Sequence, residues 1–397
     1  MKLQVFLGFC CIFLLQNNHG ATGQTYPYGG GGGIKTQSSG VKTNLGFGAQ
    51  RYNPNYNQNY NPNYNPNLNS RSTVYGRSDT REVYNLRAED VRTLRNALEA
   101  PEPDAKAIIH VLAHRSNLER VDIANLYENI HKQPLVKDLG SKLTGWFKEL
   151  IIALMMQPTQ FYVKQLYDAV NGAGTDEDAL IDILCSLNND EIRRIRKLYE
   201  HVYGGTLESH IRQDTSGDFR NLMIALVGAE RDETDFVDIS QARVNAQKLL
   251  DAGKLKWGTD EPIFLSILTQ TNYKQLRQIS IEYEKLAGHT LESAITDEFS
   301  GTLRQGLLGI LRIAQGLPVF FAERLHASME GSGTNNKQLI RLVVSRSEID
   351  IDLIKAYYKT AYKISLEDAI IDDTSGDFKE CLLAIVGGNL FQQTLKF

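Results

Sequence analysis

The chain has 397 residues, of which 42% are hydrophobic and 23% are charged, and its formal net charge is −4. This length and apolar content are enough for a large buried core. The charge is uneven, because residues 81–397 hold 37 Lys or Arg against 46 Asp or Glu, whereas residues 24–80 hold five Lys or Arg against one Asp. An acidic body is a poor partner for nucleic acid and is repelled by anionic lipid, so attraction to such a membrane would need bound cations.

Residues 1–23 have the layout of a secretory signal. Lys2 precedes an apolar run from Val5 to Leu15, and the small residues around Ala21 could supply a cleavage site. The apolar run is too short to span a bilayer. The alternative is an amphiphilic tail start that is never processed. Cleavage would make the protein extracellular, and an intact N-terminus would make it cytoplasmic.

Residues 24–80 are predicted to form a disordered tail. They contain a glycine run from Gly29 to Gly33 and a four-residue array, based on Asn-Pro-Asn-Tyr, from Asn53 to Leu68. Few aliphatic side chains and many Asn, Pro and Gly residues leave nothing from which to build a core. The spaced tyrosines could bind a protein partner or self-associate, and a flexible spacer is the alternative.

Four copies of one segment follow the tail. In every copy a Tyr lies 18 positions before the Gly of a Ser/Thr-Gly pair, as in Tyr127 and Gly145, Tyr199 and Gly217, Tyr283 and Gly301, and Tyr358 and Gly376. A fixed internal spacing of this kind indicates an array of equivalent units. We place the units at residues 85–156, 157–228, 240–314 and 317–388.

The units are predicted to be all-α, with four or five short helices each. Apolar residues of the second unit recur with the spacing of one helix face, first at Val163, Leu166, Tyr167 and Val170, then at Leu180, Ile183, Leu184 and Leu187. Thr175 is the expected N-cap of the later helix. Pro262 falls in the first turn of the corresponding helix of the third unit, where its missing N–H is harmless.

Three of the units pair a glycine-containing loop with a carboxylate 40 positions downstream, namely Gly174 with Asp214, Gly258 with Glu298, and Gly333 with Asp373. Ca²⁺ takes about six to eight oxygen ligands in flexible geometry. Glycines let a loop turn so that its backbone carbonyls converge, and a carboxylate from another segment adds oxygens and negative charge. Positions left open could take water or a lipid phosphate. The pattern therefore predicts calcium sites that couple calcium to membrane binding.

The first unit has lost both parts of the site. Glu102 stands at the loop position between Pro101 and Pro103, and Lys142 stands where the carboxylate belongs. Joint loss is expected if the two parts serve one ion. An ordinary turn would explain a single Gly-x-Gly loop, but it does not explain three paired copies and one copy without either part.

These motifs resemble the annexin family. The matching segments are Gly172 to Glu177, Lys254 to Glu261, Asp214 to Gly217 and Asp373 to Gly376. The resemblance covers about residues 85–390. It implies four five-helix domains in a slightly curved disc, with calcium loops on the convex side. It also implies reversible, calcium-dependent binding to anionic phospholipid such as phosphatidylserine, without catalysis. The signal-like start departs from the family, whose members usually lack one.

The resemblance also implies a set of calcium ligands. They are the carbonyls of Val170, Gly172 and Gly174 with Asp214 in repeat 2, those of Gly253, Lys256 and Gly258 with Glu298 in repeat 3, and those of Met329, Gly331 and Gly333 with Asp373 in repeat 4. Repeat 1 receives none. Trp257 lies between two implied carbonyl donors, so we expect its indole to contact the membrane. The alternative is that this indole packs as core.

Two other functions remain open. One is an extracellular matrix or cell-surface protein that binds calcium and assembles through the Asn/Tyr-rich tail. The other is an enzyme, but the chain has no His-Glu-x-x-His, Gly-x-Ser-x-Gly or phosphate-loop motif, and none of its eight His lies in a calcium loop. We expect no enzymatic activity. Cys185 and Cys381 lie among helical apolar residues and are expected to be reduced core residues.

Overall fold

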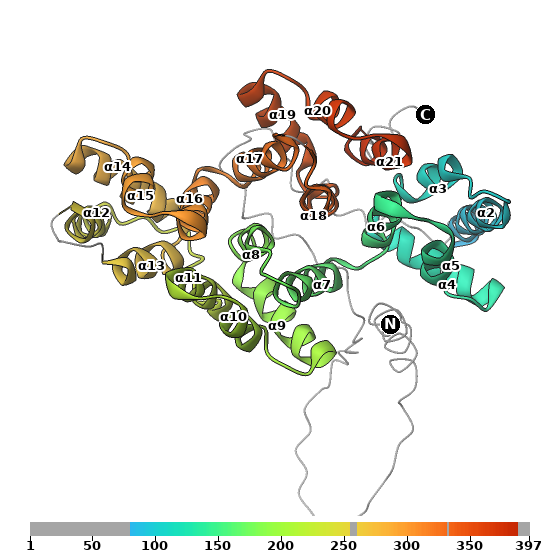
Figure 1. Ribbon diagram of the computed structural model, residues 1–397, viewed down its shortest axis with the longest axis horizontal. Coiled ribbons are helices and arrows are strands. Elements are labelled where there is room, and N and C mark those ends of the chain that lie inside the picture. The colour runs from blue at the N-terminus through green and yellow to red at the C-terminus, as the bar shows by residue number, and fades with distance from the viewer. Residues whose placement is uncertain (1–79, 255–259, 332, 388–397) are drawn as a thin grey trace, which may run out of the picture. The chain divides into compact units, whose positions relative to one another are not determined.

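The computed structural model describes residues 80–254, 260–331 and 333–387, and Figure 1 shows the arrangement of their helices. The signal-like segment, residues 24–79 of the tail, and Trp257 lie outside the described residues. Within the described ranges every regular element is an α-helix, and these ranges contain no strand. The all-α prediction is confirmed.

The described ranges hold 20 helices, α2 to α21, which form four successive sets of five. The first set is α2 (Thr80–Glu99), α3 (Ala105–Leu112), α4 (Asn117–His131), α5 (Leu135–Lys142) and α6 (Gly145–Leu154). The second set is α7 (Pro158–Val170), α8 (Glu177–Leu184), α9 (Asn189–Tyr203), α10 (Leu207–Asp214) and α11 (Gly217–Gly228).

The other two sets repeat this order. The third set is α12 (Ile239–Lys254), α13 (Glu261–Gln270), α14 (Tyr273–Ala287), α15 (Leu291–Glu298) and α16 (Gly301–Gln315). The fourth set is α17 (Leu317–Met329), α18 (Asn336–Arg346), α19 (Ile351–Tyr362), α20 (Leu366–Asp373) and α21 (Gly376–Gly387). The prediction of four repeats of about five helices is confirmed, and Pro262 lies in the first turn of α13 as expected.

Contacts divide the described residues into two compact units, one of residues 80–92 with 122–141 and the other of those within 93–121 and 142–387. In the first unit, the Tyr127 hydroxyl donates to Asp138 Oδ2 at 2.8 Å and so joins α4 to α5. In the second unit, the first and third helices of repeats 2, 3 and 4 pack together, as α7 with α9, α12 with α14, and α17 with α19.

The residues that marked the repeats in the sequence occupy fixed places in the helices. A fully buried Tyr lies in the third helix of each set, and a fully buried Leu begins the fourth. None of the eight is more than 1% exposed: Tyr127, Tyr199, Tyr283, Tyr358, Leu135, Leu207, Leu291 and Leu366. Burial of both side chains fixes the third and fourth helices against the core, which positions the end of the fourth helix.

The Ser/Thr-Gly pair makes the turn between the fourth and fifth helices. Gly145, Gly217, Gly301 and Gly376 each begin a fifth helix with φ between 58° and 63°. This left-handed conformation is strained for a residue with a Cβ atom, which explains the glycine. In repeats 2, 3 and 4 the last residue of the fourth helix, just before this turn, is the predicted calcium carboxylate, and it is half-buried.

Cys185 and Cys381 are buried free thiols, as expected. Burial raises the pKa of the Cys185 thiol to about 12, so it stays protonated and unreactive in the folded protein. Of the helices described, none combines the length and the hydropathy needed to cross a bilayer.

Candidate calcium-binding loops

The loop between the first and second helices is closed in the same way in all four repeats. The backbone N–H of the residue before the second helix donates to a carbonyl near the end of the first helix. The donor and acceptor pairs are Asp104 to Ala97, Asp176 to Ala169, Asp260 to Ala252, and Asn335 to Ser328, at 2.8 to 3.0 Å. The last carbonyls of a helix have no hydrogen-bond partner within that helix. The closure uses one carbonyl in each repeat, so the other carbonyl oxygens at the helix end and in the loop are available to a ligand.

The N-cap predicted at Thr175 is wrong by one residue. Asp176 caps α8, because its side chain accepts a hydrogen bond from Ala179 N at 2.9 Å. Asn335 caps α18 in the same way, from Gln338 N at 3.2 Å. Thr and Asp are both good caps, so composition does not separate two neighbours of these types. The structure distinguishes the two residues, because the Thr175 hydroxyl donates to Asp214 and does not cap α8.

Thr175 joins the loop of repeat 2 to its carboxylate. Its Oγ1 lies 2.8 Å from the backbone oxygen of Asp214 and 2.7 Å from Asp214 Oδ2. In repeat 4, Thr334 Oγ1 donates to the backbone oxygen of Asp373 at 2.7 Å. The structure therefore brings together the loop and the carboxylate that the sequence paired. The role of these hydroxyls was missed, although a Thr follows the last loop glycine in all three copies.

Repeat 3 is described only in part. Lys256 and Gly258 lie outside the described residues, but Gly253 and Glu298 lie within them. A Cβ atom added to Gly253 would lie 3.7 Å from Glu298 Oε1. The first carbonyl donor predicted for this site and its carboxylate are therefore neighbours.

Three glycines of the loops in repeats 2 and 4 are required by the backbone. Gly174 has φ of 95°, Gly331 of 105° and Gly333 of 126°, which residues with a Cβ atom rarely adopt. Nothing lies within 4 Å of a Cβ atom built on any of the three, so packing does not demand a small residue there. Both loops are exposed, which leaves them accessible to an ion and a surface.

One carboxylate oxygen in repeat 4 supports a cation at this place. Asp373 Oδ2 is shielded from solvent and has no hydrogen-bond partner. A buried acceptor without a partner is costly, and a bound cation would remove that cost. Among the described residues no three His, Cys, Asp or Glu side chains gather at one point, so an ion at these loops would take most of its ligands from the backbone. Hard oxygen donors with one carboxylate fit Ca²⁺.

The carboxylates also act on the buried tyrosines beneath them. Burial, with smaller contributions from Tyr362 and Asp373, raises the pKa of Tyr358 to about 12. Burial and the charge of Glu298 raise the pKa of Tyr283 in repeat 3 in the same way. In repeats 3 and 4 the charge of the candidate calcium carboxylate therefore reaches the buried Tyr of the third helix.

Repeat 1 keeps the loop closure and lacks the ligands. Asp104 caps α3 through Ala107 N at 3.0 Å, as Asp176 does for α8. Glu102, which Pro101 and Pro103 flank, stands at the position of Gly174 and Gly333, and its φ is not positive, unlike the φ of those two glycines. Lys142 is exposed at the end of α5. The backbone and the charge both make this loop unsuitable for calcium.

The annexin family model matches residues 89–154, 161–226, 244–310 and 320–385. This chain belongs to the annexin family. It is 43% identical to annexin A4 of Bos taurus over 303 residues, which cover 76% of this chain and 95% of annexin A4. The structure of an annexin A8 mutant with an intact N-terminus matches with a TM-score of 0.74 and 40% identity, covering 76% of this chain and 94% of that one. Calcium-bound annexin (Sm)1 matches with a TM-score of 0.67 and 32% identity, covering 76% and 90%.

Annexins are known for calcium-dependent phospholipid binding and are generally non-enzymatic binding proteins. They associate with membranes peripherally and are usually cytoplasmic. These findings do not favour the matrix-protein alternative for this annexin, and they support neither secretion nor a protein partner of the tail.

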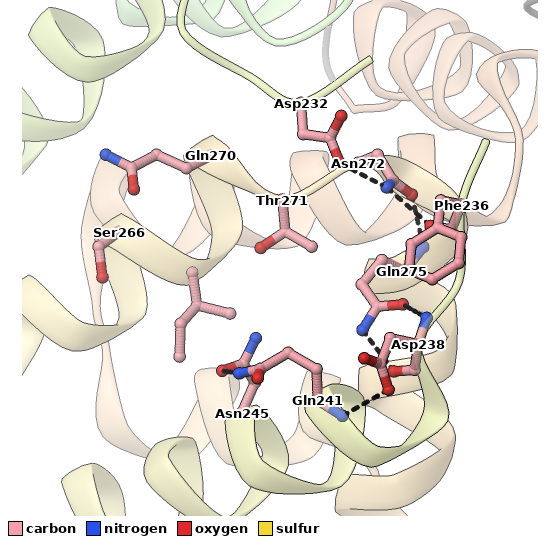
Figure 2. Close-up of a pocket in the computed structure, with 11 residues that line it drawn as sticks. Asp232, Phe236, Asp238, Gln241, Asn245, Ser266, Gln270, Thr271, Asn272 and Gln275 are labelled. Atoms are coloured by element: carbon pink, nitrogen blue, oxygen red, sulfur yellow. Dashed lines mark hydrogen bonds between the residues drawn. The ribbon is translucent and has the colours of Figure 1, made fainter. Parts of the chain in front are cut away.

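A separate polar pocket lies beside the linker between repeats 2 and 3, with a volume of about 420 Å³ (Figure 2). Its polar groups largely hold the linker in place. Gln275 accepts from Asp238 N and donates to Asp238 O, both at 2.8 Å, and Asn272 Nδ2 donates to Asp232 Oδ2 at 2.8 Å. None of the predicted site residues lines it. Its contacts give it a structural role apart from the loops.

Proposed function

We propose that this annexin binds anionic phospholipid membranes reversibly and that calcium ions bridge its loops to lipid phosphates. A bound Ca²⁺ supplies a positive charge and open coordination positions that a phosphate oxygen can fill. The supporting observation is the repeated pairing of an exposed glycine loop with one acidic residue, to which a threonine hydroxyl of the loop is hydrogen-bonded in repeats 2 and 4.

The residues that would hold the ions are those that the resemblance to annexins implies. They are Val170, Gly172, Gly174 and Asp214 in repeat 2, Gly253, Lys256, Gly258 and Glu298 in repeat 3, and Met329, Gly331, Gly333 and Asp373 in repeat 4. Repeat 1 holds none in this proposal. The domain boundaries that we propose, 85–156, 157–228, 240–314 and 317–388, each enclose one matched segment.

Electrostatics make the calcium requirement strict. Residues 81–397 hold 46 Asp or Glu against 37 Lys or Arg, so without ions the body is repelled by an anionic surface. Each ion adds two positive charges at an exposed loop. Membrane attraction should therefore grow as the loops are loaded, through the local charge of the ions, and it should disappear when the ions are removed.

The test is sedimentation of the full chain with phosphatidylserine-containing vesicles at physiological salt. We expect the protein to pellet with calcium, to be released by chelator, and to stay in solution with neutral phosphatidylcholine vesicles. Magnesium at the same concentration is the matched control for divalent charge. Equal pelleting with and without calcium would contradict the bridging mechanism.

A further inference from the structure

A buried ion cluster joins repeat 2 to repeat 4. Asp182 of α8 and Arg341 of α18 are 1% and 2% exposed at their side chains, and Arg341 Nη2 lies 2.9 Å from Asp182 Oδ2. Gln338 donates to the same oxygen at 3.2 Å. Arg324 of α17 forms ion pairs with both Asp182 and Asp178. The cluster therefore ties α8 to both helices that flank the repeat 4 loop.

Asp182 and Arg341 occupy equivalent positions in their repeats. Each lies eight residues after the last glycine of its own loop, Gly174 or Gly333. The helices α8 and α18, which both begin where a candidate calcium loop ends, lie in contact. The corresponding positions of repeats 1 and 3 carry the exposed residues His110 and Ser266. The pairing of opposite charges at this position is thus specific to repeats 2 and 4.

The cluster reaches the loops themselves. Asp176 N closes the repeat 2 loop onto Ala169 O at 2.9 Å, and Asp176 Oδ2 lies 3.4 Å from Arg341 Nη1. In repeat 4, Arg324 lies on α17, five residues before Met329, where the loop starts. Arg341 lies on α18, after the loop. The two cations from repeat 4 therefore hold three carboxylates that follow the loop of repeat 2.

Arg324 keeps its charge in the folded protein. Burial opposes the charge on Arg324, but the carboxylates of Asp182 and Asp178 outweigh this effect and raise the pKa of Arg324. A buried cation that loses its partner is strongly unfavourable, so the carboxylates and guanidinium groups must keep their mutual positions. A change in the direction of α8 at its first turn will therefore move the side chains that flank the repeat 4 loop.

We infer that this cluster couples the calcium loops of repeats 2 and 4, so that loading one raises the calcium affinity of the other, whereas repeat 3, which contributes no charge to the cluster, is not coupled through it. This inference rests on the proposed function. An ion in the repeat 2 loop fixes the first turn of α8, and Asp176 and Asp178 then order Arg341 and Arg324. Ordering the second loop costs less once the first is ordered, which produces positive cooperativity. Coupling between sites is typically about fivefold or more, and it is reciprocal.

Amide hydrogen exchange of the full chain, measured during a calcium titration, reads each loop separately. Removing the repeat 4 carboxylate with Asp373→Ala should raise the calcium midpoint for protection of residues 170–176 by about fivefold or more. Asp214→Ala should do the same for residues 329–335. Glu298→Ala is the matched control, because it removes an equivalent carboxylate from repeat 3 and should leave both midpoints unchanged.

A second comparison tests the route. The double variant Asp182→Asn with Arg341→Gln removes the central charges but keeps similar shapes and hydrogen-bonding groups. When Asp373→Ala is added to this double variant, it should no longer raise the calcium concentration at which residues 170–176 become half-protected. The pair Asp178→Asn with Arg324→Gln repeats the test at the less buried end of the cluster and should reduce the shift, even if the central variant fails to fold.

The outcomes separate the inference from the function on which it rests. A repeat 2 midpoint that Asp373→Ala leaves unchanged would overturn the coupling, and a shift that survives in both double variants would overturn this route. In either case, loops that still gain protection with calcium would leave the proposed function standing. If no loop gains protection at any calcium concentration, the proposed function itself is overturned.

Discussion

The hydroxyl of Thr175 lies 2.7 Å from Oδ2 of Asp214, a residue 39 positions away, and so fixes the candidate calcium carboxylate of repeat 2 to its loop. The equivalent hydroxyl in repeat 4, on Thr334, contacts only the backbone oxygen of Asp373, whose Oδ2 is buried without a partner. Repeat 2 thus holds its carboxylate in advance, whereas the carboxylate of repeat 4 has an oxygen that only a ligand would satisfy.

Thr175→Val should therefore weaken the repeat 2 site. The substitution keeps the shape and removes one hydrogen bond, which contributes about 1 kcal/mol to the free energy of unfolding. We expect a loss of that size in urea unfolding and a rise of a few fold in the calcium needed to protect residues 170–176. Thr175→Ser keeps the hydroxyl and should behave like the unchanged protein. A Val variant with the calcium response of the Ser variant would show that the hydroxyl does not position Asp214.

The three carboxylates should be separable in vesicle binding. Asp214→Ala, Glu298→Ala and Asp373→Ala should each raise the calcium concentration for half-maximal binding to phosphatidylserine vesicles, because each removes a charge and up to two oxygens from an ion. Lys142→Ala at the equivalent position of repeat 1 is the matched control and should change the midpoint little. An effect of Lys142→Ala as large as that of Glu298→Ala would mean that repeat 1 holds a functional site.

The internal repeats of the sequence determined how much of the candidate calcium site could be predicted. The pairing of Gly174 with Asp214 was visible because the same spacing recurs in three copies, and the resemblance supplied the remaining ligands. The N-cap was misplaced at Thr175 because local composition does not show where a hydroxyl is directed. The pairing of Asp182 with Arg341 was missed because its partners come from different repeats, and no spacing within one repeat marks it.

Asp182→Ala should be one of the most destabilising single substitutions in the chain. It leaves Arg341, which is 2% exposed at its side chain, without its main partner. Breaking a buried ion pair from one side costs about 3–5 kcal/mol. The matched control is Asp190→Ala, whose partner Arg194 is 47% exposed and whose loss should cost less than about 1 kcal/mol. Similar urea midpoints for the two variants would contradict the importance of the cluster.

Stability should fall in alkaline solution partly through Cys185. Burial raises its pKa from 9.0 to about 12, so the folded protein binds this proton more tightly than the unfolded chain does. The resulting stability is fully present below pH 9, where both states are protonated, and it is lost as the pH rises from 9 toward 12. The loss should approach about 1.4 kcal/mol per pH unit in this window.

Cys185→Ala isolates this contribution. The variant has a constant cavity cost at every pH, so the difference between its free energy of unfolding and that of the unchanged protein should be flat below pH 9 and then shrink. Urea unfolding at pH 8, 9, 10 and 11 measures that difference. A constant difference across the series would show that the thiol does not titrate on unfolding as we expect.

Trp257 should contact the membrane when calcium is bound. It lies between the proposed carbonyl donors Lys256 and Gly258, and a loop wrapped around an ion leaves an intervening side chain little room to turn inward. An indole is amphipathic and favours the lipid interface.

The only other Trp in the sequence is Trp146, which is 41% exposed and would add background emission, so the experiment uses the Trp146→Phe variant. Calcium with anionic vesicles should then shift the emission of Trp257 to the blue. Neutral vesicles, or Glu298→Ala added to the same variant, should abolish the shift, because the loop would no longer be carried to the surface. An emission maximum that is already blue and does not move with calcium would mean that Trp257 packs in the core.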